Sequence, residues 1–492
     1  MVALHAPAGA EAAMPAGSPP VGSAWGFNFD GQLGDGARVG TTTPVLVSGL
    51  TGTLAMAAGA NHSLAVETDG TLWAWGQNTY GQLGDGTRIQ RTSPVEVLSL
   101  TSATAVAGGS AYSLAVKSDR TVWAWGLNAD GQLGDGTTTD RLTPVQVSGL
   151  TGAVAVAAGE NHSLAVASDG AVWAWGDNAY GKLGDGTTTD RNSPVHVSGL
   201  TGAVAASGGC QHSLALTSDG AVWAWGGNGD GQLGDGTTTD RHTPVQVVGL
   251  TGVVAVAAGC LHSLAMTSDG TLWAWGDNSF GQLGDGTTTD RLTPVRVINL
   301  TGSVAVAGGY FYSVALRADG TVWAWGNNAD GQLGDGTLSG RHSPVMVSGL
   351  TAAVRLAAGG EHTLASAAAP RAPVITGFSP SGARVGARVS ITGQNLVRIT
   401  SVRFRRVEAT FKVVSPTQLV AVVPYGALRG LIEVSNQRWS AMATVIFWVR
   451  PSITGFSPRS GPPGTTVTVT GSAFADEVRK VLFNGTPRVL HG

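Results

Sequence analysis

Histidines recur at equivalent points of the sequence, where they could serve as metal ligands or acid–base groups. They follow a Gly-x-x motif, and tyrosine takes the same place twice; the positions are His62, Tyr112, His162, His212, His262, Tyr312 and His362. Zinc needs its ligands within about 2.0–2.2 Å of one ion. A series of seven interrupted by two tyrosines is poorly suited to that geometry. We therefore predict no metal site there. We expect each histidine to bond a backbone group within its own repeat, where tyrosine can replace it.

Two cysteines also occupy equivalent positions. Cys210 and Cys260 are fifty residues apart, and each lies two residues before a histidine. If neighbouring repeats pack side by side, the two Cα atoms can approach the roughly 4.4–6.8 Å that a disulfide requires. Two Cys-x-His pairs can alternatively hold zinc. Both arrangements stay open, but we expect two free thiols, because other repeats place unrelated residues at this position.

No common catalytic signature is present: the sequence lacks a Gly-x-Ser-x-Gly elbow, a P-loop lysine motif and a His-Glu-x-x-His pattern. The loop from Asn128 to Asp135 has some calcium-loop residues, but no bidentate glutamate follows them. The sequence therefore predicts a protein that is not an enzyme and carries no cofactor.

The histidines and cysteines belong to a repeat of fifty residues. Its core is Trp-Ala-Trp-Gly followed by Gly-Gln/Lys-Leu-Gly-Asp-Gly; full copies begin at Trp73, Trp123, Trp173, Trp223, Trp273 and Trp323, and a short copy lies at Ala24-Trp25-Gly26. In the copy from 142 to 176 we expect strands at 143–147, 154–158, 162–166 and 171–175, with a hairpin turn at Asp169-Gly170. Four short antiparallel strands at this period predict a β-propeller, here with seven blades. The last copy lacks its Trp strand, so we expect the N-terminal strand at 22–26 to complete the last blade.

A change of composition marks the end of the repeats. Residues 1–370 have a formal charge of −14, whereas residues 371–492 have a charge of +11. The acidic charge of the repeats argues against nucleic-acid binding by this part. Beyond residue 372 the segment 374–380 returns at 452–458, and alternating strands predict small β-sandwiches. We expect a disordered leader (1–20), a propeller (21–368), a complete sandwich (373–450) and a partial second one (451–492), with the chain being a fragment of a longer protein.

These repeats resemble a known family. Trp-Ala-Trp-Gly-x-Asn-x-x-Gly-Gln-Leu-Gly-Asp-Gly with Ala-Ala-Gly-x-x-His-Ser-Leu-Ala is similar to the regulator of chromosome condensation repeat, over residues 24–365. The resemblance implies a seven-bladed propeller whose Gly-x-x-His loops often form a partner-binding face. The later units are similar to IPT/TIG immunoglobulin-like modules, which occur in receptors, bacterial surface proteins and some transcription factors.

Variation among near-identical repeats indicates where a partner binds. The two residues before each histidine or tyrosine differ between copies, and we predict a partner-binding site at Glu160, Asn161, Cys210, Gln211, Cys260, Leu261, Tyr310, Phe311 and Glu361. Aromatic anchors are typical of binding hot spots. We predict a non-enzymatic interaction scaffold that binds a protein and forms part of a larger bacterial surface or secreted protein. No run of residues is apolar enough for a membrane span, and residues 1–20 do not read as a signal peptide. Alternatives are a guanine-nucleotide exchange factor-like regulator of a small GTPase, which the uninterrupted repeat spacing disfavours, and a carbohydrate-binding propeller.

Overall fold

The computed structural model describes residues 20–368, 372–396, 399–415, 417–436, 439–462, 464–474, 481–483 and 486–488. All but the last residue of the predicted leader therefore lies outside the described residues. The chain divides into two compact units, residues 1–369 and 370–492, and each is treated by itself. Regular structure within the described ranges is β-strand, apart from one 3-10 turn, η1 (Ala179–Gly181).

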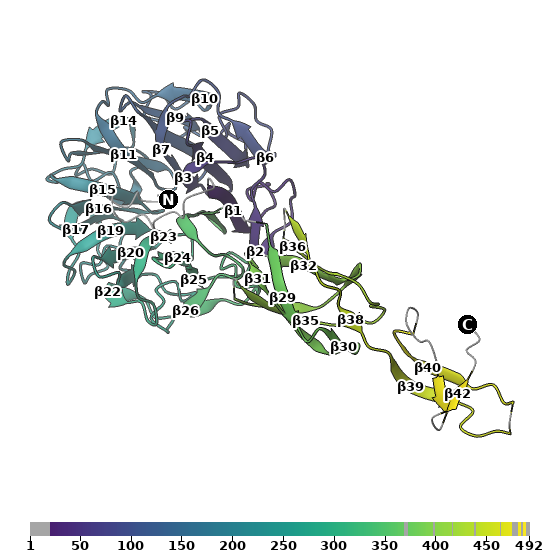
Figure 1. Cartoon of the computed structure of the whole chain (residues 1–492). Helices are drawn as coiled ribbons and strands as arrows, with labels where there is room; N and C mark the ends of the chain where they lie inside the picture. Colours follow the sequence, from purple (N-terminus) through teal and green to yellow (C-terminus); the bar gives the residue numbers. More distant parts are fainter. Residues whose placement is uncertain are drawn as a thin grey trace. The chain divides into compact units, whose positions relative to one another are not determined.

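The first unit is a ring of seven four-stranded antiparallel sheets, the blades of the predicted propeller (Figure 1). The inner strands, which contact each other around the axis, are β3 (Thr53–Ala58), β7 (Ala103–Gly108), β11 (Ala153–Ala158), β15 (Ala203–Gly208), β19 (Val253–Ala258), β23 (Ser303–Gly308) and β27 (Ala353–Ala358). The second strands are β4 (His62–Glu67), β8 (Tyr112–Lys117), β12 (His162–Ala167), β16 (His212–Thr217), β20 (His262–Thr267), β24 (Tyr312–Arg317) and β28 (His362–Ala368).

The outer half of each blade comes from the Trp strand and the Pro-Val strand. The third strands are β5 (Leu72–Gly76), β9 (Val122–Gly126), β13 (Val172–Gly176), β17 (Val222–Gly226), β21 (Leu272–Gly276), β25 (Val322–Gly326) and β1 (Pro20–Gly26). The outer strands are β6 (Arg91–Glu96), β10 (Arg141–Gln146), β14 (Arg191–His196), β18 (Arg241–Gln246), β22 (Arg291–Arg296), β26 (Arg341–Met346) and β2 (Thr41–Leu46). The sequence-based unit, which began with the strand at 143–147, is therefore out of phase with the blade. That strand, β10, pairs with β9 and ends the preceding blade.

Small residues suit the crowded inner strands, and tryptophans fill the space between blades. Trp175 is fully buried, and its Nε1 donates to the backbone oxygen of Gln132 in the loop of the preceding blade (2.9 Å). The Ser163 hydroxyl donates to the same oxygen (2.8 Å). The loop comes this close because Gly134 has no side chain; a Cβ there would lie 2.7 Å from Trp175 Nε1, and φ is +69°. Each Trp-Ala-Trp-Gly strand is thus locked to the Gly-Asp-Gly loop of its neighbour.

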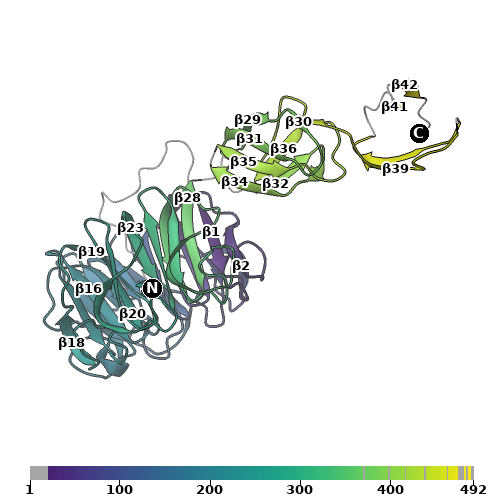
Figure 2. The same ribbon diagram turned by 90° about the horizontal axis from the view of Figure 1, so that it is seen from below.

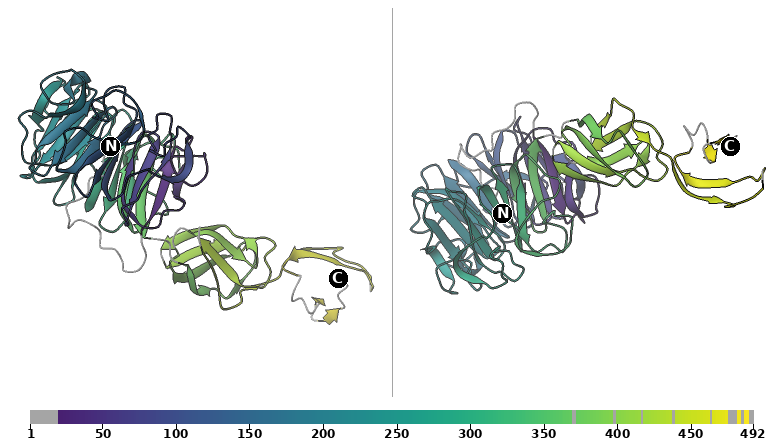
Figure 3. Two further views of the ribbon diagram at one scale, coloured as in Figure 1. Left: turned by 90° about the horizontal axis from the view of Figure 1, so that it is seen from above. Right: turned by 60° about the horizontal axis from the view of Figure 1, so that its bottom comes forward.

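The N-terminal strand closes the ring, as predicted. β1 pairs with β28, and Trp25 lies opposite Thr363 just as Trp175 lies opposite Ser163 in an internal blade. Figure 2 shows β1 and β2 beside β28, and Figure 3 shows the blades from two further directions. The outer strand β2 comes from the same N-terminal segment, so two strands rather than one complete the last blade. Without β1 and β2 the last blade would end at β28, whose outer edge would then be unpaired.

Repeated polar contacts hold the long loop between the third and outer strands. After β13, Asn178 Nδ2 donates to Asp185 Oδ1 (3.3 Å), and Arg191 Nη2 donates to Asp185 Oδ2 (2.7 Å). Burial works to raise the pKa of Asp185, but hydrogen bonds from Thr187 and Arg191 outweigh it and hold that pKa below its usual value. The same Asp–Arg pair occurs in six blades, whereas the seventh has Thr41 in the place of the arginine.

The second unit begins with a sandwich of two four-stranded sheets around its own core. One sheet has the order β29-β31-β35-β34 and the other β33-β32-β36-β37. The strands are β29 (Val374–Ser379), β30 (Gly382–Ala383), β31 (Arg388–Gln394), β32 (Ile399–Phe404), β33 (Val407–Glu408), β34 (Phe411–Ser415), β35 (Gln418–Val422), β36 (Ile432–Asn436), β37 (Ser440–Met442) and β38 (Trp448–Val449). Phe404 and Phe447 pack edge to face in the core, with ring centroids 5.0 Å apart.

The sequence repeat within this unit is reproduced in the backbone. β39 (Ser452–Ser457) pairs with β40 (Thr468–Ser472), and Ile453 lies opposite Gly471 as Ile375 lies opposite Gly393. Two short strands follow, β41 (Val481–Phe483) and β42 (Thr486–Arg488). Ile375 is 9% exposed, whereas Ile453 is 61% exposed, because the strands that cover the first copy have no counterpart among the described residues of the second.

Candidate partner-binding face

Seven equivalent residues surround the propeller axis at one end. These axial positions are Ala60, Ser110, Glu160, Cys210, Cys260, Tyr310 and Gly360. The backbone N–H of each donates to a backbone oxygen of the next blade, over 2.9–3.2 Å, and the last bonds back to the first blade; the donor–acceptor pairs are Ala60 to Gly109, Ser110 to Glu160, Glu160 to Gly209, Cys210 to Cys260, Cys260 to Gly309, Tyr310 to Gly360 and Gly360 to Gly59. A closed ring of backbone hydrogen bonds therefore joins all seven blades around the axis at this end.

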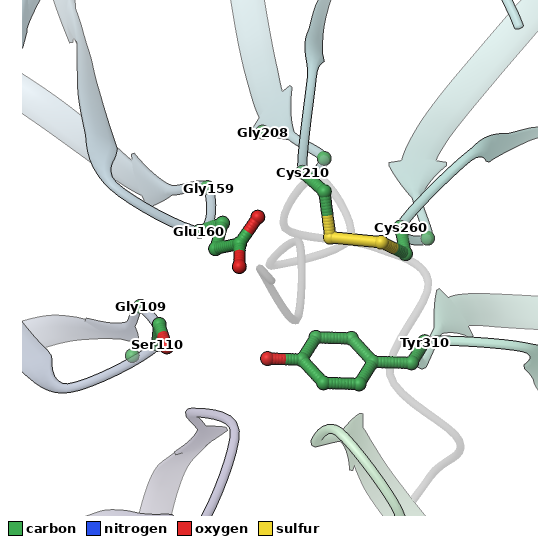
Figure 4. Close-up of a pocket in the computed structure, with 11 residues that line it drawn as sticks. Gly109, Ser110, Gly159, Glu160, Gly208, Cys210, Cys260 and Tyr310 are labelled. Carbon is green, nitrogen blue, oxygen red and sulfur yellow. A yellow bond between two sulfur atoms is a disulfide. The ribbon is translucent and has the colours of Figure 1, made fainter. Parts of the chain in front are cut away.

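Four predicted site residues meet at this ring. Glu160, Cys210, Cys260 and Tyr310 line one small cavity on the axis together with Ser110 and glycines of the inner strands. In Figure 4 the Glu160 carboxylate points into the cavity, and the Tyr310 hydroxyl points towards Ser110 and Glu160. Burial raises the pKa of the Glu160 carboxyl, and burial together with the nearby Glu160 charge raises the pKa of Tyr310 to about 12. Four of the nine residues predicted for partner binding thus lie together on the axis.

The two cysteines are joined. Cys210 and Cys260 form a disulfide, with their Cα atoms 4.5 Å apart. The expectation of two free thiols is wrong, because axial positions of neighbouring blades lie close enough for the bond. The cross-link ties the fourth and fifth blades together beside the Glu160 carboxylate (Figure 4).

The other predicted residues lie around the cavity rather than in it. Phe311 packs against Phe280 of the neighbouring loop, with ring centroids 5.3 Å apart. Glu361 is half-buried; burial and then the charge of Asp330 raise the pKa of its carboxyl. The remaining three, Asn161, Gln211 and Leu261, are half-buried, and their backbone oxygens accept hydrogen bonds from the loops that follow the third strands.

The histidines bond across blades, which corrects the expectation of a contact within one repeat. His212 is fully buried, and its Nε2 lies 2.9 Å from Ser263 Oγ of the next blade. Burial, followed by the neighbouring His262, lowers the pKa of His212 to about 3, so the ring is neutral. Tyrosine replaces histidine by reaching farther into the next blade: the Tyr312 hydroxyl donates to the backbone oxygen of His362 (2.5 Å).

These histidines do not assemble a metal site. Within the described ranges, no group of three or more His, Cys, Asp or Glu side chains is placed to hold an ion. In the loop considered for calcium, the Asp135 carboxylate is instead bound by Arg141, 2.6 Å away. Sequence reasoning expected contacts within one repeat and missed the partners of the histidines in the next blade.

The end of the propeller that carries the axial positions is here called the loop face, because the long loops surround them. These loops and the axial turns, together with the arginine that opens the outer strand in six of the blades, contain nineteen Asp or Glu and nine Lys or Arg residues, a formal charge of −10. Eight of the nine basic side chains form ion pairs with aspartates, such as Lys182 with Asp177 and Arg191 with Asp185. The loop face is therefore strongly acidic.

Sequence reasoning overlooked one pattern of the loop face. One loop position alternates between aspartate and an aromatic residue around the ring: Asp30, Tyr80, Asp130, Tyr180, Asp230, Phe280 and Asp330. The three aromatic side chains are 38–47% exposed. Burial and then nearby carboxylates raise the pKa values of Asp130 and Asp230. The signal was present in the sequence as a period of one hundred residues.

Within the described residues, no helix has the length and apolar character needed to cross a membrane. Comparison of the chain with curated proteins gave no match. Among solved structures, the chain is similar to Prp20p from Saccharomyces cerevisiae, with 22% identity and a TM-score of 0.65 over 74% of this chain and 95% of that one. It is also similar to human WBSCR16, with 24% identity and a TM-score of 0.65 over 71% of this chain and 99% of that one. At these identities the likeness concerns the fold alone.

Family models cover most of the chain. The RCC1-like domain matches residues 22–260, and the regulator of chromosome condensation (RCC1) repeat matches residues 269–316 and 319–366. A second model of that repeat matches residues 253–282 and 304–332. The IPT/TIG domain matches residues 373–442 and 451–491. The chain thus belongs to the RCC1-repeat proteins, with an RCC1-like seven-bladed propeller followed by IPT/TIG domains.

Proposed function

We propose that this protein is a non-enzymatic interaction scaffold whose propeller binds a protein partner through the loop face. One observation carries the proposal: side chains that differ among otherwise near-identical blades converge on one end of the axis, with Glu160 and Tyr310 in the cavity and Phe311 beside it. The exposed aromatic residues around them supply apolar contact area of the kind that anchors protein interfaces.

The related structures support protein binding in general terms. Prp20p is described by its binding to Gsp1p and histones, and yeast RCC1 by its complex with Kap60. These partners belong to those proteins. What they suggest for this chain is the class of function, a propeller that recognises another protein, rather than the identity of the partner.

We further propose that the chain forms part of a larger bacterial surface or secreted protein. The combination with IPT/TIG modules favours that setting, and the Cys210–Cys260 disulfide is consistent with it, because disulfides persist mainly in oxidising compartments.

The proposal is tested by capturing partners on the full chain and on two double variants. Tyr310→Ala with Phe311→Ala removes the aromatic pair at the axis, and Met346→Ala with Val248→Ala removes exposed apolar side chains elsewhere on the propeller. We expect the first variant to lose a partner that the wild type and the second variant retain, as followed by quantitative mass spectrometry and by titration of the purified partner. Equal capture of the partner by all three proteins would show that the loop face is not the binding site.

A further inference from the structure

The axial cavity has the chemistry of a cation site. It is lined by one carboxylate (Glu160), two hydroxyls (Ser110 and Tyr310) and the Cys210–Cys260 disulfide. Among the residues that the structure describes, the Glu160 carboxylate has no hydrogen-bond or ion-pair partner. The basic side chain whose charge most affects it, Lys182, is already paired with Asp177 and donates to the backbone oxygen of Cys210 (3.3 Å). A half-buried carboxylate without a partner favours a bound positive charge.

The backbone around the cavity strengthens this preference. An anion would need free N–H donors, but all seven axial N–H groups are consumed by the closed ring of hydrogen bonds. Carbonyl oxygens retain a second lone pair when they accept one hydrogen bond. The backbone of the ring therefore offers acceptors and no free donors to a ligand on the axis, and the acidic loop face around it attracts cations from solution.

The size of the cavity limits which cationic group can enter it. Its volume is about 10 Å³, which is the space of roughly one water-sized group. An ammonium group is a compact point charge with three donors, whereas a guanidinium is a planar fork with five. The cavity therefore suits the end of a lysine side chain, with the Glu160 carboxylate and the Ser110 and Tyr310 hydroxyls as acceptors.

We propose that a lysine side chain of the protein partner inserts its ammonium group into the axial cavity against Glu160. The partner is then a basic polypeptide segment whose remaining positive charges face the Asp-rich loops. This inference rests on the proposed function, which makes the loop face the docking surface. It adds which chemical group of the partner enters the cavity.

The test uses the full chain and fluorescent nonapeptides with a central lysine, flanked by glycines and two further lysines, whose binding is followed by fluorescence anisotropy at low salt. Matched peptides carry acetyl-lysine or arginine at the centre. The variants are Glu160→Gln and, as a control with the same charge change, Glu96→Gln, whose side chain is exposed on the outer strand β6. Hydrogen bonds to charged groups are worth about 1.5–3 kcal/mol, so we expect Glu160→Gln to weaken binding of the lysine peptide about tenfold or more.

We expect Glu96→Gln to change the affinity less than about twofold and central acetylation to cost as much as Glu160→Gln. Equal binding by the two variants, or indifference to acetylation, would overturn the ammonium site. Tighter binding of the arginine peptide would overturn the assignment to lysine. Failure of the proposed function gives a different result. In that case the Tyr310→Ala/Phe311→Ala variant still captures the same partner as the wild type, regardless of the affinities measured with the peptides.

Discussion

The buried histidines make the propeller sensitive to acid in a way that one substitution can measure. His212 is fully buried, its Nε2 faces Ser263 Oγ, and its Nδ1 has no partner among the described residues. Burial, with His262 as a smaller cause, lowers the pKa of His212 to about 3, against a usual value of 6.5. Since the unfolded chain binds the proton more tightly than the folded one, the free energy of unfolding falls as pH drops below 6.5 and continues to fall until about pH 3.

The magnitude follows from this difference. In that window, each such histidine contributes a slope of about 1.4 kcal/mol per pH unit, so between pH 7 and pH 4.5 the loss is about 2.5 kcal/mol per histidine. Tyrosine does not titrate in this range, and Tyr312 shows that the position accepts it. We therefore expect His212→Tyr to lose about 2.5 kcal/mol less than the wild type over this interval.

The measurement is urea unfolding of the full chain at pH 7, 5.5 and 4.5, followed by tryptophan fluorescence. The reciprocal variant Tyr112→His is the matched control, because it adds a buried histidine at an equivalent point and should lose about 2.5 kcal/mol more than the wild type. Contributions of carboxylates are common to all three proteins and cancel in the comparison. If the three stability curves run parallel with pH, then the histidines are not the buried neutral groups that the structure describes.

Three further predictions concern the frame of the propeller. Replacing both Cys210 and Cys260 by serine should lower the free energy of unfolding by up to about 4 kcal/mol, since the disulfide spans 50 residues; an unchanged urea midpoint would mean that the bond contributes nothing. Trp25→Ala should cost about 3–5 kcal/mol because Trp25 is fully buried in the closing blade, whereas Trp439→Ala, at a half-exposed site, should cost far less in the same thermal and urea scans. Arg191→Thr should cost about 1–3 kcal/mol by leaving the Asp185 carboxylate without its ion pair, and a loss below about 0.5 kcal/mol would show that the pair is dispensable, as in the blade with Thr41.

Repetition explains why the fold could be predicted in such detail. Trp25 could be assigned to the last blade because its environment is fixed by the six other Trp-Ala-Trp-Gly strands, and its register opposite Thr363 follows theirs. The contacts of His212 and the bond between Cys210 and Cys260 were predicted wrongly for a common reason. Both depend on how closely neighbouring blades approach at the axis, a distance that the spacing of residues along the chain does not determine. The alternation of Asp130 and Tyr180, in contrast, was visible in the sequence and needed only comparison of every second repeat.

The geometry at the axis explains why the axial residue varies between blades whereas the residue two places later is always histidine or tyrosine. At the axial positions the backbone alone closes the ring, so residues as different as Glu160, Tyr310 and Gly360 fit the same place. Two residues later the side chain itself bridges to the next blade, and only histidine and tyrosine occur there. Apart from Cys210 and Cys260, whose side chains form the disulfide, substitutions at the axial positions are therefore expected to disturb the fold little. A propeller built in this way can vary its axial side chains without rebuilding its blades, and this is the physical reason why we place the proposed ligand against Glu160.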